Sequence, residues 1–426
     1  MSTPDRKTQP LTVTPSAGII PEPEKVMLNN YVPVYLTGKG TEDLLRIEFV
    51  FDAGQVMETL QMTASVTNEM LTEGTSLHNA VTLNEAIDHT GAVFTPVVDK
   101  DKAGLVIITL LKTLDRVLEL AAETLYNPVF PDDEFELLRD RKYQQYLTNR
   151  KKTSVVSREL FFNSLFGDTQ YGRITKTEDF NILNTSALRD FHSEFYTAGN
   201  LYITVAGKDP RRALPVLEKF FSSHKTDKAI SESRSLYCGN SGGENKFAEV
   251  PGSVQSSIRI GWKGIEKDHP DFPGLQVANT ILGGYFGSRL MKNIREDKGF
   301  TYGIGSVAGA LKHGGYISVI TDVATQYRDK TIKEIFREIE KLRKKEVSDN
   351  ELMLVRNHMM GDLARAFDGP FAVAEALRGV LDSGLSMDYY RKLGDTIKTI
   401  SPGKIKELFN TYYNHEEAII VTAGTK

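Results

Sequence analysis

Apolar and polar residues alternate along several short segments of the chain and recur at helical spacing along others. The clearest alternation is Leu44-Leu-Arg-Ile-Glu-Phe-Val-Phe51, which predicts a half-buried strand. Residues 91–98 and 103–110 predict a strand pair joined by a polar turn. Apolar residues three and four apart over 111–125 predict an amphipathic helix, which Pro128 ends. The first half of the chain therefore mixes strands with helices.

Two segments about 200 residues apart repeat nearly the same order of residues. The first, from Phe191 to Lys208, runs from a helix end into an apolar strand that closes on Val-Ala-Gly. The second, from Leu408 to Thr425, ends the chain in the same way with Val-Thr-Ala-Gly. This repeat predicts an α+β fold of two homologous domains, each a mainly antiparallel sheet packed with helices, which together form a clamshell.

The composition between the two halves is typical of a linker. Residues 224–246 collect Ser, Gly, Asn and charged residues. We therefore predict an N-terminal domain over 1–223, a linker over 224–246 and a C-terminal domain over 247–426. A chain of 426 residues fits two or three domains at the usual ~100–200 residues each.

Composition and charge exclude several classes of protein. The chain has 52 basic and 56 acidic residues, a formal net charge of -4, so no field for nucleic acid and no polybasic membrane patch is expected. Cys238 is the only cysteine, which excludes a disulfide framework. There is no apolar run of the ~18 residues that a membrane span needs. The first residues do not form a signal peptide, so we expect a cytoplasmic protein.

The chain shows no complete catalytic constellation when its residues are considered alone. No two of the eight histidines lie three or four residues apart, the spacing that a helical metal site requires. The glycine-rich segment 283–290 lacks the Lys-Ser/Thr ending of a phosphate-binding loop. No serine lies in a Gly-x-Ser-x-Gly elbow.

One segment of the second half nevertheless resembles a known signature. Leu282-Gly-Gly-Tyr-Phe-Gly-Ser-Arg-Leu-Met-Lys-Asn-Ile-Arg-Glu-Asp-Lys-Gly-Phe-Thr-Tyr302 is similar to the C-terminal-domain signature of the insulinase-like (pitrilysin-type) metallopeptidases. In that family an arginine and a tyrosine seven residues later contact the substrate backbone, which implies substrate-binding roles for Arg295 and Tyr302. The resemblance continues in the first half in Phe51-Asp-Ala-Gly54, Glu73-Gly-Thr75 and 165–173.

The chain departs from the family at the zinc site. Catalytic members carry His-x-x-Glu-His on a helix of the first domain, and a glutamate about 76 residues later completes the ligands. Here the helix expected over 62–71 places Ser65, Asn68 and Glu69 at the motif positions, and Gln145 at the later one. One carboxylate cannot hold zinc alone, so the resemblance implies a chain with no catalytic residue and no metal of its own.

The family suggests what such a chain does. It includes two-chain bacterial enzymes in which one subunit carries the zinc motif, while the other lacks it and keeps the Arg–Tyr pair. The resemblance implies that this chain is the non-catalytic, substrate-binding subunit of a heterodimeric zinc-dependent peptidase that cleaves peptides in a closed chamber. The zinc is then expected in a homologous partner subunit. The alternative is a catalytically inactive scaffold or a peptide-binding pseudoenzyme, in which Arg295 and Tyr302 only support the fold.

Overall fold

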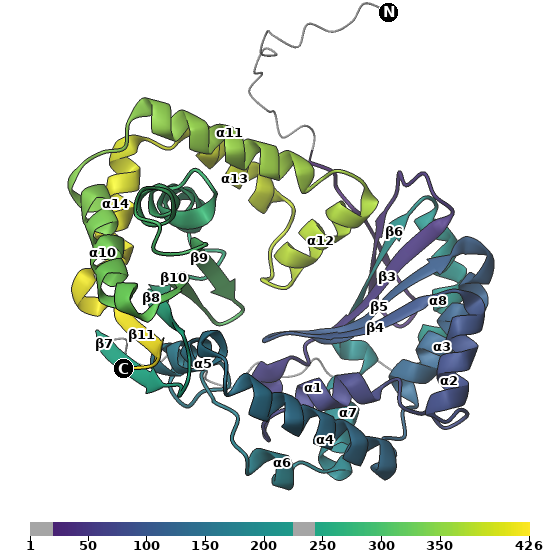
Figure 1. Ribbon diagram of the computed structural model, residues 1–426. Coiled ribbons are helices and arrows are strands. Elements are labelled where there is room, and N and C mark those ends of the chain that lie inside the picture. The colour runs from purple at the N-terminus through teal and green to yellow at the C-terminus, as the bar shows by residue number, and fades with distance from the viewer. Residues whose placement is uncertain (1–19, 225–242) are drawn as a thin grey trace, which may run out of the picture.

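Two β-sheets, each layered with helices, make up the protein and face each other as the halves of a clamshell (Figure 1). The computed structural model describes residues 20–224 and 243–426. Strands and helices alternate along both halves, so the predicted α+β class is confirmed. The predicted linker lies almost entirely at 225–242, outside the described residues, and the domain boundaries stay a prediction.

The first sheet has six strands in the order β1-β2-β6-β3-β5-β4. The pairs are antiparallel except β2 with β6, which run parallel. The strands are β1 Glu24–Met27, β2 Pro33–Thr37, β3 Leu44–Phe51, β4 Val93–Val98, β5 Ala103–Leu110 and β6 Leu201–Gly207.

The second sheet repeats this arrangement with five strands in the order β7-β11-β8-β10-β9. Its first pair is parallel and the others are antiparallel, as in the β2-β6-β3-β5-β4 part of the first sheet. The repeated segments of the sequence contribute β6 and β11, which hold equivalent places, so the predicted duplication is confirmed. The strands are β7 Glu244–Glu249, β8 Gln255–Gly264, β9 Ile304–Leu311, β10 Gly314–Ala324 and β11 Ile419–Gly424.

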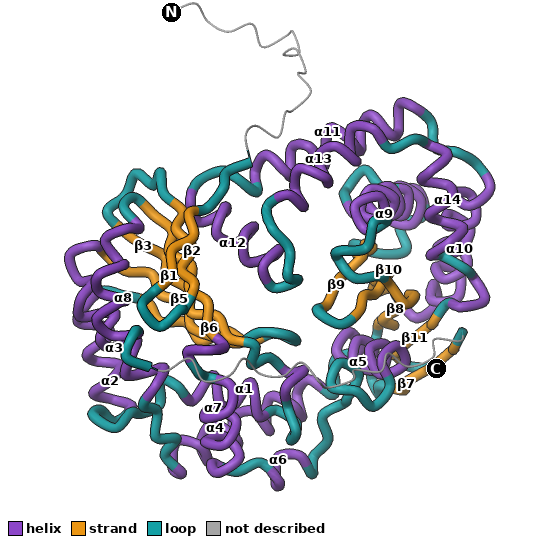
Figure 2. Tube along the Cα trace, turned by 180° about the vertical axis from the view of Figure 1, so that it is seen from behind, coloured by secondary structure: helices purple, strands orange, loops and turns teal. Residues whose placement is uncertain are grey.

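Helices cover both sheets (Figure 2). No helix among the described residues is long and apolar enough to span a membrane. Those of the first half are α1 Thr63–Met70, α2 Ala80–Thr90, α3 Leu114–Tyr126, α4 Asp132–Asn149, α5 Thr153–Phe166, α6 Asp179–Ile182, α7 Thr185–Phe195 and α8 Leu214–Phe221. Those of the second half are α9 Phe272–Asn279, α10 Arg328–Lys344, α11 Asp349–Arg365, α12 Pro370–Leu381, α13 Asp388–Thr399 and α14 Pro402–Tyr412.

The two faces of strand β3 pack against different parts of the protein. Alternate residues such as Ile47 and Phe49 belong to the core formed with α3 and α8. The other face carries Arg46 and Glu48, and the Glu48 side chain is fully buried. The prediction of a half-buried strand was therefore wrong for β3, because residues of a helix from the other half form ion pairs with Arg46 and Glu48 on its polar face.

That helix is α12, which belongs to the second half and packs on β2 and β6 (Figures 1 and 2). Arg378 of α12 forms ion pairs with Glu48 at 3.5 Å, Asp99 at 3.3 Å and Asp382 at 3.4 Å. The Tyr202 hydroxyl donates a hydrogen bond to Asp382 at 2.6 Å. Burial raises the pKa of the Glu48 and Asp382 carboxyls, so Arg378 offsets a real cost of burying charge.

Helix α5 crosses between the halves in the other direction. It belongs to the first half and packs on β8 and β11 of the second sheet. Its Phe161 and Leu165 share an apolar cluster with Ile419 and Val421 of β11. The Phe161 ring lies against Gly261 of β8, where a Cβ atom would come within 2.5 Å of that ring and 2.1 Å of the Ile317 carbonyl oxygen. Glycine is therefore required at 261 by close approach.

This contact gives the first prediction. Gly261→Ala is expected to lower the free energy of unfolding by about 1–3 kcal/mol, because the Ile317 backbone cannot move away from the new methyl group. Gly361→Ala is the matched control, since its Cβ meets nothing within 4 Å in the middle of α11. The control should stabilise the protein by about 1 kcal/mol or less. Urea unfolding measures both, and wild-type stability of Gly261→Ala would contradict the close approach of Ile317 and Phe161 to this position.

Candidate substrate-binding site

The segment 282–302 that resembles the family signature lies between α9 and β9. It contains two π-helical turns, η5 Thr280–Gly284 and η6 Met291–Asp297. Such turns are rare and occur frequently at functional sites. The sequence analysis did not predict them, since spacing of apolar residues does not distinguish a π-helical turn from an α-helix.

The first of these turns is fixed onto strand β9. The Asn279 side-chain amide donates to the Ser306 carbonyl at 3.0 Å, and the Ser306 hydroxyl donates back to the Asn279 carbonyl at 3.1 Å. A Cβ atom on Gly283 would lie 2.7 Å from the Ser306 backbone nitrogen. The glycine in the Leu-Gly-Gly signature thus allows the turn to touch the strand.

The second turn is fixed onto two helices. The Asn293 side chain, which is buried, donates to Glu338 of α10 at 2.6 Å. Arg289, just before the turn, donates to both oxygens of Glu351 at the start of α11 at 2.8 Å each. A two-point bond of this kind fixes direction as well as distance. Arg295 therefore projects from a rigid base.

Arg295 and the backbone of Tyr302 lie together. The Arg295 Nε donates to the Tyr302 carbonyl at 2.9 Å, and the guanidinium carbon lies 4.7 Å from the centre of the Phe286 ring. The Tyr302 side chain is 94% exposed, so its hydroxyl is open to solvent. Phe286 lies inside the quoted signature, but the sequence did not predict its contact with Arg295.

Tyr302 precedes β9 and does not belong to it. The apolar pattern of Tyr302–Ala308 predicts a strand from residue 302, whereas β9 begins at Ile304. The difference has a local cause, because side chains take the carbonyls that a strand would use. Arg295 bonds to the Tyr302 carbonyl, and the Thr321 hydroxyl donates to the Gly303 carbonyl at 2.9 Å.

The chemistry of the site is that of hydrogen-bond donation. A guanidinium offers five N–H donors and a phenol one, and neither needs a change of protonation to donate near neutral pH. The Arg295 Nε donates to the Tyr302 carbonyl, and the two terminal nitrogens have no hydrogen-bond partner among the described residues. Such donors suit a peptide carbonyl or a developing oxyanion.

The positions that correspond to the family's zinc ligands do not fit a zinc ion. The Asn68 side chain is buried and donates to the Gly104 carbonyl at 2.9 Å and the Tyr196 hydroxyl at 3.1 Å. The Ser65 hydroxyl donates to a backbone carbonyl of its own helix, and Gln145 is exposed on α4. Within 20–224 and 243–426, no three His, Cys, Asp or Glu side chains are placed to hold a metal.

The remaining position, Glu69, is paired with a lysine. The Lys142 ammonium lies 2.6 Å from a Glu69 carboxylate oxygen and connects α1 with α4. These are the helices that carry Ser65, Asn68 and Gln145. An internal ammonium thus neutralises the only carboxylate of the set. Lys142 lies one helical turn before Gln145, a spacing that could have suggested the pair from the sequence.

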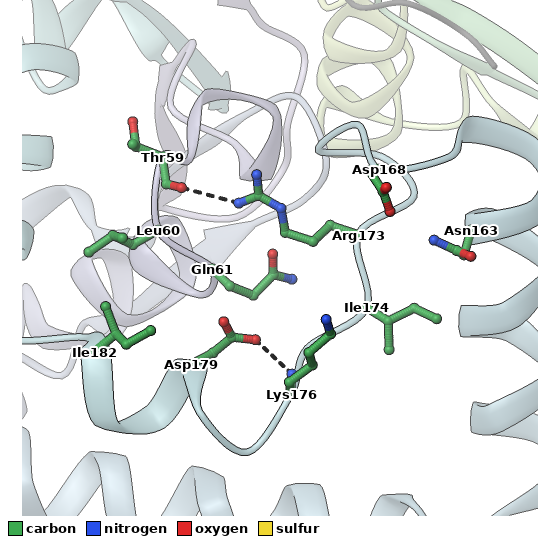
Figure 3. A pocket seen from close by; sticks show the side chains of 10 residues that line it. All are labelled: Thr59, Leu60, Gln61, Asn163, Asp168, Arg173, Ile174, Lys176, Asp179 and Ile182. Atoms are coloured by element: carbon green, nitrogen blue, oxygen red, sulfur yellow. Dashed lines mark hydrogen bonds between the residues drawn. The ribbon is translucent and has the colours of Figure 1, made fainter.

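A separate pocket of about 580 Å³ lies beside the loop that leads into α1 (Figure 3). It contains none of the residues predicted from the sequence as site residues. The Arg173 guanidinium donates to the Thr59 carbonyl at 3.1 Å. The lining residues are Thr59, Leu60, Gln61, Asn163, Asp168, Arg173, Ile174, Lys176, Asp179 and Ile182.

Directly before this loop, Glu58 caps the N-terminus of α1 with its carboxylate. Its two oxygens accept from the backbone nitrogens of Met62 at 3.1 Å and Ala64 at 3.0 Å. The side chain is only 3% exposed. Burial raises the pKa of Glu58 to about 7, against the effect of the two backbone donors.

Part of the chain matches a known protein family, and several known proteins are similar to it along most of its length. Residues 183–359 match the family described as "Peptidase M16 inactive domain". A protein of Rickettsia felis named "Uncharacterized zinc protease" is 24% identical over 301 residues, which cover 70% of this chain and 72% of that protein. The Bacillus subtilis "Uncharacterized zinc protease YmxG" is 23% identical over 297 residues, covering 69% and 71%.

Solved structures show the same fold. The peptidase M16 inactive domain from Pseudomonas fluorescens has a TM-score of 0.87 at 21% identity and covers 95% of this chain and 98% of that one. The periplasmic protease PqqL from Escherichia coli has a TM-score of 0.78 at 13% identity, and covers 100% of this chain but 49% of that one. These matches confirm the resemblance to the M16, insulinase-like peptidases, and the match of 183–359 to the inactive domain is consistent with a non-catalytic member.

The second prediction concerns zinc. The purified chain is expected to bind no stoichiometric zinc, because Glu69 is the one charged ligand of the set and Lys142 already pairs with it. Dialysis against zinc followed by metal analysis provides the measurement. Tight binding that a chelator removes and that Glu69→Gln abolishes would contradict the assignment of these positions.

The third prediction concerns pH and Glu58. Because its folded pKa is about 7 and the ordinary value is 4.5, its stabilising contribution is complete below pH 4.5 and is lost as pH rises through 7. Glu58→Gln removes this titration. Between pH 5 and pH 8 the free energy of unfolding of wild type should fall relative to the variant by roughly 3 kcal/mol.

The control for this prediction is Glu85→Gln, at an exposed position of α2. It should follow wild type at both pH values, because the side chain meets solvent before and after unfolding. Urea unfolding at each pH gives the comparison. A Glu58→Gln curve parallel to wild type would show that Glu58 does not titrate in this range.

Proposed function

We propose that this chain is the non-catalytic, substrate-binding subunit of a heterodimeric zinc-dependent peptidase. A homologous subunit supplies the zinc and its activated water, and this chain supplies Arg295 and Tyr302 to a peptide held between the two. In the proposal the pair works in the cytoplasm, the compartment expected from the sequence. PqqL, similar in fold, is named a periplasmic protease.

The observation that carries the proposal is the state of the Arg–Tyr pair. Arg295 is held by the Tyr302 carbonyl and the Phe286 ring, on a turn anchored to α10 and α11, while the Tyr302 phenol stands in solvent. A donor that is held in place before substrate arrives needs no reorganisation during reaction. A large aromatic side chain with 94% exposure, next to a held arginine, has the character of a binding residue.

Two further observations support the division of labour. The residues at the zinc positions of this chain form internal hydrogen bonds and an ion pair, which supports a zinc ion held by another subunit. The whole chain also matches in fold 49% of the length of PqqL. A fold of this size therefore makes up about half of PqqL. In the proposal a second chain supplies the other half for this protein.

The position of the pair favours extended peptides. Tyr302 lies two residues before β9, which is the edge strand of the second sheet. Edge strands offer unpaired backbone groups to an added strand, which gives affinity with little dependence on sequence. We therefore expect unfolded peptides as substrates.

The scaffold alternative also has an observation in its favour. The Arg295 Nε is used in a bond to the backbone of the same segment, which is what a purely structural arginine would do. In that case the guanidinium stabilises the fold, and the Tyr302 hydroxyl has no role in folding or in binding.

The fourth prediction separates these functions. In the complex with its zinc-bearing partner, Arg295→Ala and Tyr302→Phe should each slow peptide turnover by about 10²–10³-fold, because each removes a donor to the transition state. Arg295→Lys should restore little, since an ammonium lacks the planar fork. Steady-state kcat and KM are the measurements.

The matched controls are Arg391→Ala, an exposed arginine of α13, and Tyr31→Phe, an exposed tyrosine of the first half. Both should leave turnover unchanged. Unchanged turnover for Arg295→Ala and Tyr302→Phe as well, with the complex intact, would favour the scaffold. The isolated chain should leave the same peptides uncut, because it has no metal-activated water.

A further inference from the structure

Phe286 is an aromatic residue whose exposure to solvent is not explained by its contact with Arg295. Tyr285 has an extended backbone, with φ -150° and ψ 171°, and its ring stacks on His358 of α11 at 4.8 Å. Because successive side chains of an extended segment point in opposite directions, the Phe286 side chain is turned outward. It is 62% exposed, although the Arg295 guanidinium stacks on it.

The exposed ring is held in place from both sides. On one side the preceding turn η5 is bonded to β9 through Asn279 and Ser306. On the other side Arg289 is bonded at two points to Glu351. A rigid, exposed aromatic side chain offers contact area at a small entropic cost, which is characteristic of binding hot spots.

We propose that Phe286 forms an apolar subsite for the substrate, which receives a large apolar side chain of the residue whose carbonyl binds Arg295. This inference rests on the proposed function and names the substrate class: extended peptides with Leu, Phe or a similar residue at that position. The 4.7 Å between guanidinium and ring is comparable with the ~3.3 Å rise per residue of an extended chain, so one residue reaches both.

A simpler role for Phe286 would be to hold Arg295 in position. The two roles differ in a measurable way. If Phe286 only positions the guanidinium, its removal weakens every peptide equally, because each peptide offers the same carbonyl. If Phe286 contacts a side chain, its removal weakens only peptides that carry a large apolar residue. Burial of one such side chain corresponds to about 10-fold or more in affinity.

The test uses the full-length chain and two fluorescein-labelled ten-residue peptides of Gly, Ser and Thr that differ only in a central Leu or Ser. Binding is followed by fluorescence anisotropy. Wild type should bind the Leu peptide about 10-fold more tightly than the Ser peptide. Phe286→Ala should weaken binding of the Leu peptide much more than binding of the Ser peptide and so lose this preference, while Phe286→Leu should keep most of it.

The chain offers a matched control in Phe247→Ala. Phe247 lies on β7, is 37% exposed and carries Arg328 at 5.4 Å from its ring centre, so it reproduces the Phe–Arg stack away from the signature segment. This variant should bind both peptides as wild type does. Thermal unfolding of each variant checks that the fold is intact.

Each other outcome overturns the inference in its own way. An equal loss for both peptides in Phe286→Ala would leave Phe286 as a positioning residue. Equal binding of both peptides by wild type would exclude an apolar subsite while leaving the proposed peptide-binding function in place. Failure of wild type to bind either peptide would contradict the proposed function together with the inference.

Discussion

Each of the two sheets has a face that the helices of its own half leave uncovered, and the fold depends on covering it with a helix from the other half. The two exchanges use different physics. Helix α5 lies on the second sheet through an apolar contact in which Phe161 meets Gly261. Helix α12 lies on the first sheet through Arg378, which pairs with Glu48, Asp99 and Asp382. Separation of the halves would expose the apolar contact of α5 and break the ion pairs of Arg378 with Glu48 and Asp99, so the clamshell is held at two points.

This mutual support lets the two halves differ in chemistry while they keep one topology. In the first half the helix that carries zinc in catalytic relatives has become structural, with Asn68 bonded into the core and Glu69 paired with Lys142. In the second half the equivalent region contains two π-helical turns and presents Arg295 and the Tyr302 phenol to solvent. The two halves therefore share one topology but differ in what they present to solvent.

Local patterns in the sequence predicted the features of the fold that depend on neighbouring residues, such as strand bounds. The bounds of β3 and β5 follow from alternation, and the repeated segments predicted the equivalent places of β6 and β11. The exchange of α5 and α12 could not be predicted, because Arg46 and Glu48 look the same in sequence whether water or a distant helix covers them. The roles that the signature implies for Arg295 and Tyr302 stay a prediction. The exposure of Phe286 depends on Tyr285 packing against His358, a contact across 73 residues of chain. Burial that depends on distant partners is not visible in spacing.

The central claim is that this chain completes the active site of a zinc-bearing homologue. The most direct measurement is the rate of cleavage of a quenched fluorescent peptide by a purified zinc-bearing homologue while this chain is titrated into it. The account predicts that the homologue alone is nearly inactive, and that the rate rises with added chain and levels off at one chain per homologue. A homologue that cleaves at its full rate without this chain would contradict the claim.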